Sequence, residues 1–211
     1  FSADAVQIRN GQLVHARVTW HDDMIRFDYV KDGVSMAQIF DTAQHRMVWL
    51  DTESKQYIER QLDSTSMPES VVTTSARLDN PCKVFTKAEC VKLKTVELNG
   101  RKADKWLITF THGQFDEHLF QWIDKKLGIV IRQESPDGSM FEITVQENID
   151  YDGRKARKQH MYAVGRDGMA REGIQWIDAD LDIVLRQEND SGAIDELRNL
   201  RTGKVDPALF R

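Results

Sequence analysis

The chain has 211 residues, 40% of them hydrophobic, and a formal net charge of −5 at pH 7. This hydrophobic content supports a packed core and excludes a chain that is disordered for lack of apolar residues. The negative charge argues against a nucleic-acid-binding protein, which usually carries a basic surface. No apolar run approaches the roughly 18 residues needed for a transmembrane helix.

The first part of the chain predicts one short helix followed by strands. Ser2 is a suitable N-cap for a helix over Ala3–Ile8 that ends at Asn10 and Gly11. Beyond it, apolar residues alternate with polar ones between turn residues, which is typical of strands. The pattern predicts the strands Leu13–Trp20, Met24–Val30, Val34–Phe40, Arg46–Leu50 and Gln56–Gln61.

The alternation stops between residues 62 and 80. Ser66 as an N-cap and Pro68 in the first turn indicate a short amphipathic helix, with Met67 and Leu78 on roughly one side. We therefore expect this segment to cover part of the sheet.

Cys82 and Cys90 are the only cysteines, and seven residues separate them. Metal binding is disfavoured because no histidine lies nearby to complete a set of ligands. The even count favours a disulfide over two free thiols in a cytosolic protein. Because disulfides persist in oxidising compartments, and because the chain begins at Phe1 instead of Met, we expect an exported protein whose signal peptide has been removed.

A tandem repeat occupies the second half of the chain. Residues 100–103 recur as 153–156, and residues 121–134 recur as 175–188 with ten of fourteen positions identical. Two ordered blocks at shifts of 53 and 54 residues indicate a structural duplication. A weaker copy is Met47–Asp51, where a tryptophan again precedes an aspartate at a turn.

Each repeat, about 100–149 and 153–200, alternates like a meander of about four antiparallel strands. We predict a single β-domain over residues 1–211, built on one strongly curved antiparallel sheet with a few short helices. The apolar side chains of the repeats are expected to share its inner face, either as a packed core or as the lining of a ligand pocket. They are Trp106, Ile108, Phe110, Phe120, Trp122, Ile129, Ile131, Phe141, Ile143 and Trp176.

Residues for catalysis or cofactor binding are not evident. The six histidines are scattered without a metal-binding spacing. Carboxylates such as Asp178 and Asp180 lie at predicted turns, where turn geometry explains them. The basic run Arg154–Lys158 is either a partner patch or a strand edge protected against aggregation. We expect a non-enzymatic protein without cofactor or metal.

The chain resembles the LolA/LolB-like superfamily of periplasmic lipoprotein-sorting proteins. The segments that carry the resemblance are Phe1–Asp4, Met24–Phe27, Phe40–Asp41 with Met47–Asp51 and Gln56–Glu59, Asn80–Cys82 with Cys90, Glu97, Gly100, Trp106 and Leu209–Phe210. Because it has these cysteines, the chain resembles a cysteine-bearing relative of the lipoprotein carriers more than a carrier itself. The resemblance implies a half-open barrel with helices over its mouth and Arg26 reaching from the sheet to those helices.

From the resemblance we expect a periplasmic protein that binds a lipid or lipoprotein acyl chain on the concave face of the half-barrel. The alternative is an envelope protein–protein interaction module with a filled core and no ligand cavity. Neither function involves nucleic acid or a transmembrane segment.

Overall fold

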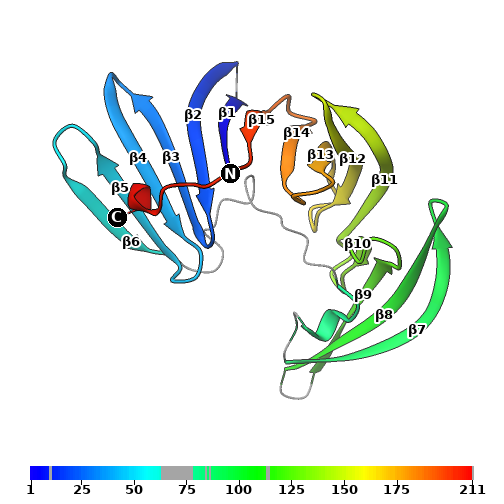
Figure 1. Ribbon diagram of the computed structural model, residues 1–211. Coiled ribbons are helices and arrows are strands. Elements are labelled where there is room, and N and C mark those ends of the chain that lie inside the picture. The colour runs from blue at the N-terminus through cyan, green and yellow to red at the C-terminus, as the bar shows by residue number, and fades with distance from the viewer. Residues whose placement is uncertain (10, 63–77, 84, 86, 113–114, 211) are drawn as a thin grey trace. The chain divides into compact units, whose positions relative to one another are not determined.

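The computed structural model describes residues 1–9, 11–62, 78–83, 85, 87–112 and 115–210, and this part of the chain is mainly antiparallel β-structure (Figure 1). Its helices are the short 3-10 helices η1 (Pro81–Lys83) and η2 (Pro207–Phe210). The strands are β1 (Ser2–Arg9), β2 (Gln12–His21), β3 (Met24–Lys31), β4 (Val34–Asp41), β5 (Arg46–Asp51), β6 (Tyr57–Gln61), β7 (Ala88–Leu98), β8 (Arg101–His112), β9 (Phe115–Asp124), β10 (Val130–Glu134), β11 (Met140–Tyr151), β12 (Arg154–Val164), β13 (Ala170–Asp178), β14 (Val184–Asn189) and β15 (Ile194–Arg201).

The strands predicted between Leu13 and Gln61 are confirmed as β2 to β6. The helix predicted over Ala3–Ile8 is wrong, because this segment is β1. β1 pairs with β2 on one side and with β15 on the other. Two neighbouring strands thus satisfy its backbone groups, and this tertiary pairing outweighs the local helix signal. Most of the helix predicted from Ser66 to Leu78 lies outside the described residues.

The chain forms two compact units, Phe1–Val72 with Val184–Arg211 (unit 1) and Thr73–Ile183 (unit 2). In unit 1 the strand order is β6-β5-β4-β3-β2-β1-β15-β14. The chain's first and last strands, β1 and β15, lie side by side (Figure 1). No described helix is long and apolar enough to cross a membrane.

In unit 2 the strand order is β13-β12-β11-β10-β9-β8-β7. The turn between β7 and β8 reaches across two strands, because the Asn99 side chain donates to Glu142 Oε1 on β11 at 2.9 Å. Arg101, at the start of β8, is also paired with Glu147 on β11 at 2.7 Å. This unit therefore folds over part of its own face.

Each unit has its own hydrophobic cluster. In unit 1 the cluster is built around Val18, Ile25 and Phe40, and in unit 2 it is built around Trp122 and Ile131. The sequence predicts a single domain over residues 1–211, and this stays a prediction.

The predicted disulfide between Cys82 and Cys90 is present. Cys90 is paired with Ile108 across β7 and β8, so the bridge lies on the same face of the sheet as Ile108. Phe85, inside the loop that the bridge closes, packs edge-on against Phe110 with ring centroids 5.4 Å apart. The disulfide thus holds Cys82, and with it the nearby Phe85, against this face.

The same turn follows the three Trp-x-Asp segments. The backbone N–H of Asp51, Asp124 and Asp178 donates to the carbonyl five residues later, at 2.8–2.9 Å. One carboxylate oxygen of each aspartate accepts the backbone N–H groups two and three residues later. Residues that permit positive φ stand four positions after each aspartate, namely Lys55, Gly128 and Asp182.

Candidate functional site

One face of unit 1 carries a continuous set of apolar side chains. Ala5 is paired with Ala16 on β2 and with Leu197 on β15, and Val18 is paired with Phe27 on β3. Residues opposite each other in antiparallel strands share a face, and every second residue along a strand returns to it. These five side chains therefore lie on one face of the sheet.

This face contains a pocket of about 100 Å³. Ala5 and Ala16 have short side chains, which leave space between the longer side chains of their neighbours. Phe27 forms one wall and packs edge-on against Phe40, with ring centroids 5.9 Å apart. The lining residues are Ala5, Val6, Gln7, Val14, Ala16, Phe27, Val184, Leu185, Asp195, Glu196 and Leu197.

The apolar end of the pocket adjoins the core of unit 1. Ala3, Val18 and Ile25 are fully buried and belong to one cluster, against which Ala5, Phe27 and Leu197 pack. At the other end stand two polar residues, Gln7 and Asp195, which are paired across β1 and β15. The pocket is thus apolar on the core side and polar toward the strand ends.

The residues expected to line a pocket in the repeats do not share one face. Trp106, Ile108 and Phe110 are opposite Gln121, Leu119 and Glu117, whereas Trp122 and Phe120 are opposite Lys105 and Leu107. Because neighbouring residues of a strand point to opposite faces, Phe120 and Trp122 lie on the face opposite to Trp106, Ile108 and Phe110. The prediction of one common inner face is wrong at this point.

The remaining predicted residues divide in the same way. Phe141 is opposite Gln133, which is opposite Gln121, so Phe141 and Ile143 lie on the Trp106 face. Trp176 is opposite Lys158, and the pairing places it on the Trp122 face. Ile129 and Ile131, at the irregular start of β10, are buried in the cluster with Trp122.

The Trp106 face is partly covered. Ile108 is fully buried, and the segment tethered by the disulfide packs against Phe110. One of the ten predicted residues, Phe110, lines a pocket. That pocket, of about 520 Å³, also contains Glu117, His118, Asp137 and Arg166. It is a polar depression and not the apolar cavity expected.

The two tryptophans of the repeat are in matching surroundings. The Lys105 ammonium lies 4.5 Å from the Trp122 ring centroid, and the Lys158 ammonium lies 5.1 Å from that of Trp176. In each case the lysine is the residue directly opposite the tryptophan. Trp122 is 8% exposed, so its ring is part of the hydrophobic core on this face. The Lys105 ammonium makes a cation–π contact with the ring.

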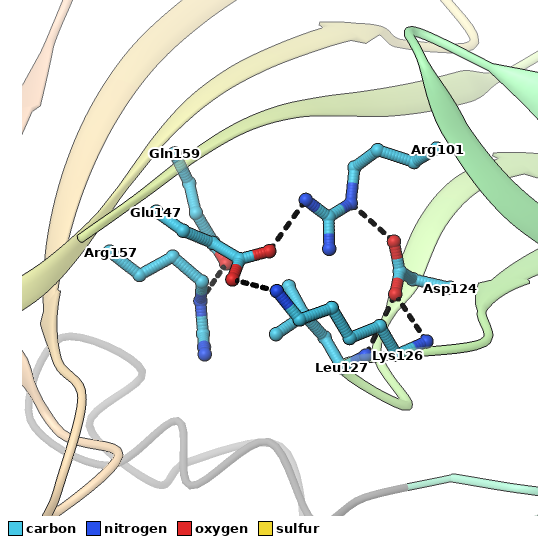
Figure 2. A network of polar contacts seen from close by, with 7 residues as sticks. All are labelled: Arg101, Asp124, Lys126, Leu127, Glu147, Arg157 and Gln159. Atoms are coloured by element: carbon cyan, nitrogen blue, oxygen red, sulfur yellow. Dashed lines mark hydrogen bonds and ion pairs between the residues drawn. The ribbon is translucent and has the colours of Figure 1, made fainter.

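A buried carboxylate anchors each copy of the repeated turn. Asp124 and Asp178 are both 1% exposed and are paired with Arg101 and Arg154. Figure 2 shows how Arg101 also reaches Glu147, which accepts from Lys126 at 2.6 Å. This network ties the start of β8, the turn after β9 and the middle of β11 together.

The environment lowers the pKa of both aspartates. Burial favours the neutral carboxyl, but the hydrogen bond from Arg101 and the backbone N–H of Leu127 outweigh it and hold the pKa of Asp124 below its ordinary value. The same balance, with Arg154 and Leu181, lowers the pKa of Asp178. Both carboxylates therefore stay ionised in the buried ion pairs of the repeat.

Arg26, expected to contact a covering helix, is 15% exposed. It pairs with Asp28 at 2.6 Å, and its Nη1 donates to the backbone carbonyl of Leu209 in η2 at 2.5 Å. Arg26 thus holds the C-terminal 3-10 helix on β3. This contact lies on the face opposite to Phe27 and the pocket, since Arg26 and Phe27 are neighbours in one strand.

Within the described residues, no group of three or more His, Cys, Asp or Glu is placed to hold a metal ion. A further depression of about 760 Å³ in unit 1 is lined by apolar residues such as Leu13 and Val30 and by charged residues that include Asp4, Arg17 and Asp28. Arg17 donates to Asp4 at 2.8 Å, and Arg26 is paired with Asp28, so both carboxylates already have partners.

The pocket of unit 1 is not predicted by the sequence patterns. Ala5 and Gln7 fall within the predicted helix Ala3–Ile8, although Ala3, Ala5 and Gln7 alternate with Asp4, Val6 and Ile8 as in a strand. Val14, Ala16 and Val18 alternate likewise in β2. The remaining wall, Leu185 and Leu197, could not be placed beside them because its position depends on pairing between the two ends of the chain.

No family model matches the chain, and no curated protein matches its sequence. Solved structures similar to it include a DUF1329 family protein from Desulfovibrio piger, which is 14% identical over 100% of this chain and 88% of that chain, with a TM-score of 0.37. The LolA superfamily protein NE2245 from Nitrosomonas europaea is 9% identical over 100% of this chain and 88% of that chain, with a TM-score of 0.39.

A third similar structure is the Pseudomonas aeruginosa MucA/MucB complex, 12% identical over 94% of this chain and 88% of that chain, with a TM-score of 0.25. The similar structures thus include a protein of the superfamily that the sequence resembles. Identities of 9–14% with TM-scores below 0.5 carry no argument about what this chain binds.

Proposed function

We propose that the chain is a non-catalytic exported protein that binds the hydrocarbon part of a lipid or other amphiphile on the apolar face of unit 1. The observation that carries the proposal is the pocket around Ala5 and Ala16, which is walled by Phe27, Leu185 and Leu197. Burying apolar ligand surface there is favourable by about 25 cal/mol per Å².

The size of the pocket limits what enters it. Pockets for whole small molecules usually measure about 300–1,000 Å³, and a dry cavity of about 150 Å³ holds one benzene. A pocket of about 100 Å³ therefore takes one end of an amphiphile, and the rest of its hydrocarbon chain lies along the apolar face. A half-barrel, as the family resemblance implies, would cover that part of the ligand.

The disulfide between Cys82 and Cys90 supports export, because such bonds persist in oxidising compartments. The resemblance to lipoprotein-sorting proteins supports the periplasm of a Gram-negative-type envelope. The absence of catalysis is part of the proposal and is supported by the buried carboxylates of the repeat, which are committed to ion pairs.

A single-chain alcohol such as decanol, used below its aggregation concentration, tests the proposal by isothermal titration calorimetry. We expect saturable binding to the wild-type chain and its loss in Ala16→Phe, which fills the pocket. Ala43→Phe, at an exposed turn, is the matched control and should bind like the wild type. Ala5→Val, a smaller intrusion, should weaken binding and covers the case in which the larger substitution disrupts folding.

Circular dichroism must show that each variant is folded. Wild-type protein that binds no decanol would refute the proposed function. Unchanged binding in folded Ala16→Phe and Ala5→Val would instead place the ligand elsewhere.

A second candidate is an envelope interaction module, and β6 favours it. Tyr57 and Ile58 are 66% and 69% exposed. The backbone N–H of Asp51 donates to the carbonyl of Gln56. Hydrogen-bonded and non-hydrogen-bonded residue pairs alternate along antiparallel strands, so the backbone groups of Tyr57 and Glu59 point away from β5. Such an edge can accept an extended strand of a partner. Edge strand β7, in contrast, carries lysines and a bulge that protect it.

A further inference from the structure

We infer that the pocket of unit 1 selects amphiphiles with a neutral, hydrogen-bonding head over those with an anionic head, through Gln7 and Asp195. The inference rests on the proposed function and specifies its ligand class.

The pocket is apolar at one end and polar at the other, and this polarity orients an amphiphile. Ala5 is paired with Ala16 and Leu197, and two residues further along β1 Gln7 is paired with Val14 and Asp195. In the opposite direction the floor continues to buried side chains of the core cluster. A hydrocarbon chain therefore points toward Phe27 and the core, and its head lies beside Gln7 and Asp195.

Asp195 makes the head position unfavourable for an anion. Its side chain is 16% exposed, and both of its oxygens accept from Arg9 Nη2 at 3.1 and 3.2 Å. Arg9 is 52% exposed, so solvent screens the guanidinium more than it screens the carboxylate. A carboxylate head would meet this partly buried like charge, and repulsion at short range is strong where the dielectric is low.

Glu196 adds no negative charge at the position of the head. It also lines the pocket, but its side chain lies on the other face because its partners across the strands are Val6 and Arg186. Arg186 and Arg198 both form ion pairs with it there.

Gln7 supplies the complementary group for a neutral head. Its side-chain amide offers donors and an acceptor, and no partner for this amide occurs within the described residues. A hydroxyl, amide or ester head can exchange hydrogen bonds with it without placing a negative charge beside Asp195. The pocket is accordingly suited to fatty alcohols, amides and esters, and it disfavours free fatty acids.

The experiment compares decanol with decanoate at neutral pH by isothermal titration calorimetry, with both ligands monomeric. We expect decanol to bind wild-type protein about tenfold more tightly than decanoate, which corresponds to about 1.4 kcal/mol. Asp195→Asn removes the negative charge and should raise decanoate affinity to that of decanol. Asp32→Asn, at the exposed turn before β4, is the matched control and should keep the preference. Gln7→Leu should weaken decanol binding about fivefold.

The outcomes separate the two proposals. If neither ligand binds wild-type protein, the proposed function fails. If both bind equally, or if folded Asp195→Asn keeps the preference for decanol, the head-group inference is overturned while the binding function stands. Decanol affinity unchanged by Gln7→Leu would also overturn it.

Discussion

At the scale of single residues, the two copies of the repeat contain the same Arg–Asp ion pair, but the arginines differ in exposure. Arg101 and Arg154 occupy equivalent positions and bind the buried carboxylates of Asp124 and Asp178. Arg101 is 15% exposed and has Glu147 as a second partner, whereas Arg154 is 30% exposed. Because solvent screens the second pair more, the first should contribute more to stability.

Arg101→Met should therefore destabilise the chain by about 3 kcal/mol, since it leaves the Asp124 carboxylate buried without its cation. The loss is measured as a fall in the free energy of unfolding in urea. Arg154→Met provides the matched control at the equivalent position, and we expect a smaller loss there. Equal losses at both sites would show that burial of the arginine does not determine the contribution of the pair.

The lowered pKa values of Asp124 and Asp178 predict a dependence of stability on pH. The unfolded chain takes up these protons near the ordinary pKa of 3.8, whereas the folded chain resists protonation to lower pH. Their contribution to stability is therefore complete above that value and is lost as the pH falls through the folded pKa.

Unfolding in urea across a pH series from about 6 to about 3 checks this linkage. We expect Asp124→Asn combined with Asp178→Asn to lower stability at pH 6 and to flatten the decline toward acid. A double variant that loses stability as steeply as the wild type would assign the acid sensitivity to other carboxylates, among them Glu147.

At the scale of elements, the disulfide ties η1 to β7. The loop it closes is short, since the two cysteines are separated by 8 in the sequence. A cross-link of this span stabilises a fold by about 2–3 kcal/mol through the unfolded state. Cys82→Ser combined with Cys90→Ser should cause about this loss in urea unfolding, and reduction of the wild type should reproduce it.

The same variant has a local consequence. Without the bridge, Phe85 keeps its ring contact with Phe110, which contributes about 0.5–1.5 kcal/mol beyond area burial, and its backbone hydrogen bonds with Pro81 and Ala88. Hydrogen exchange at the start of β7 should therefore accelerate, while exchange in β2 and β3 of unit 1 stays unchanged as an internal control. Unchanged exchange at β7 would show that the segment is fixed without the disulfide.

At the scale of the whole molecule, the separate cores of the two units predict two unfolding transitions. Ile25 is fully buried in the cluster of unit 1, and Ile25→Ala should cost about 2–5 kcal/mol. Differential scanning calorimetry should show this variant lowering one transition and Arg101→Met lowering the other. A single transition shifted by both variants would support the one domain that the sequence predicts.

The sequence alone determined features that depend on neighbouring residues. Strands β2 to β6 follow from alternation, the disulfide follows from two isolated cysteines, and the turns after Trp122 and Trp176 follow from the repeated blocks. Local patterns specify these features because a turn and its hydrogen bonds lie within a few residues of chain.

Which side chains meet depends on strand pairing that local sequence patterns do not specify. The hairpin between β8 and β9 sets Trp106 opposite Gln121 instead of Trp122, and because side chains alternate with a period of two, a shift of one residue moves a ring to the other face. The pairing of β1 with β15 likewise turned an expected helix into a central strand of unit 1. It placed Leu197 beside Ala5 and so completed the pocket, through contacts between residues that no local pattern connects.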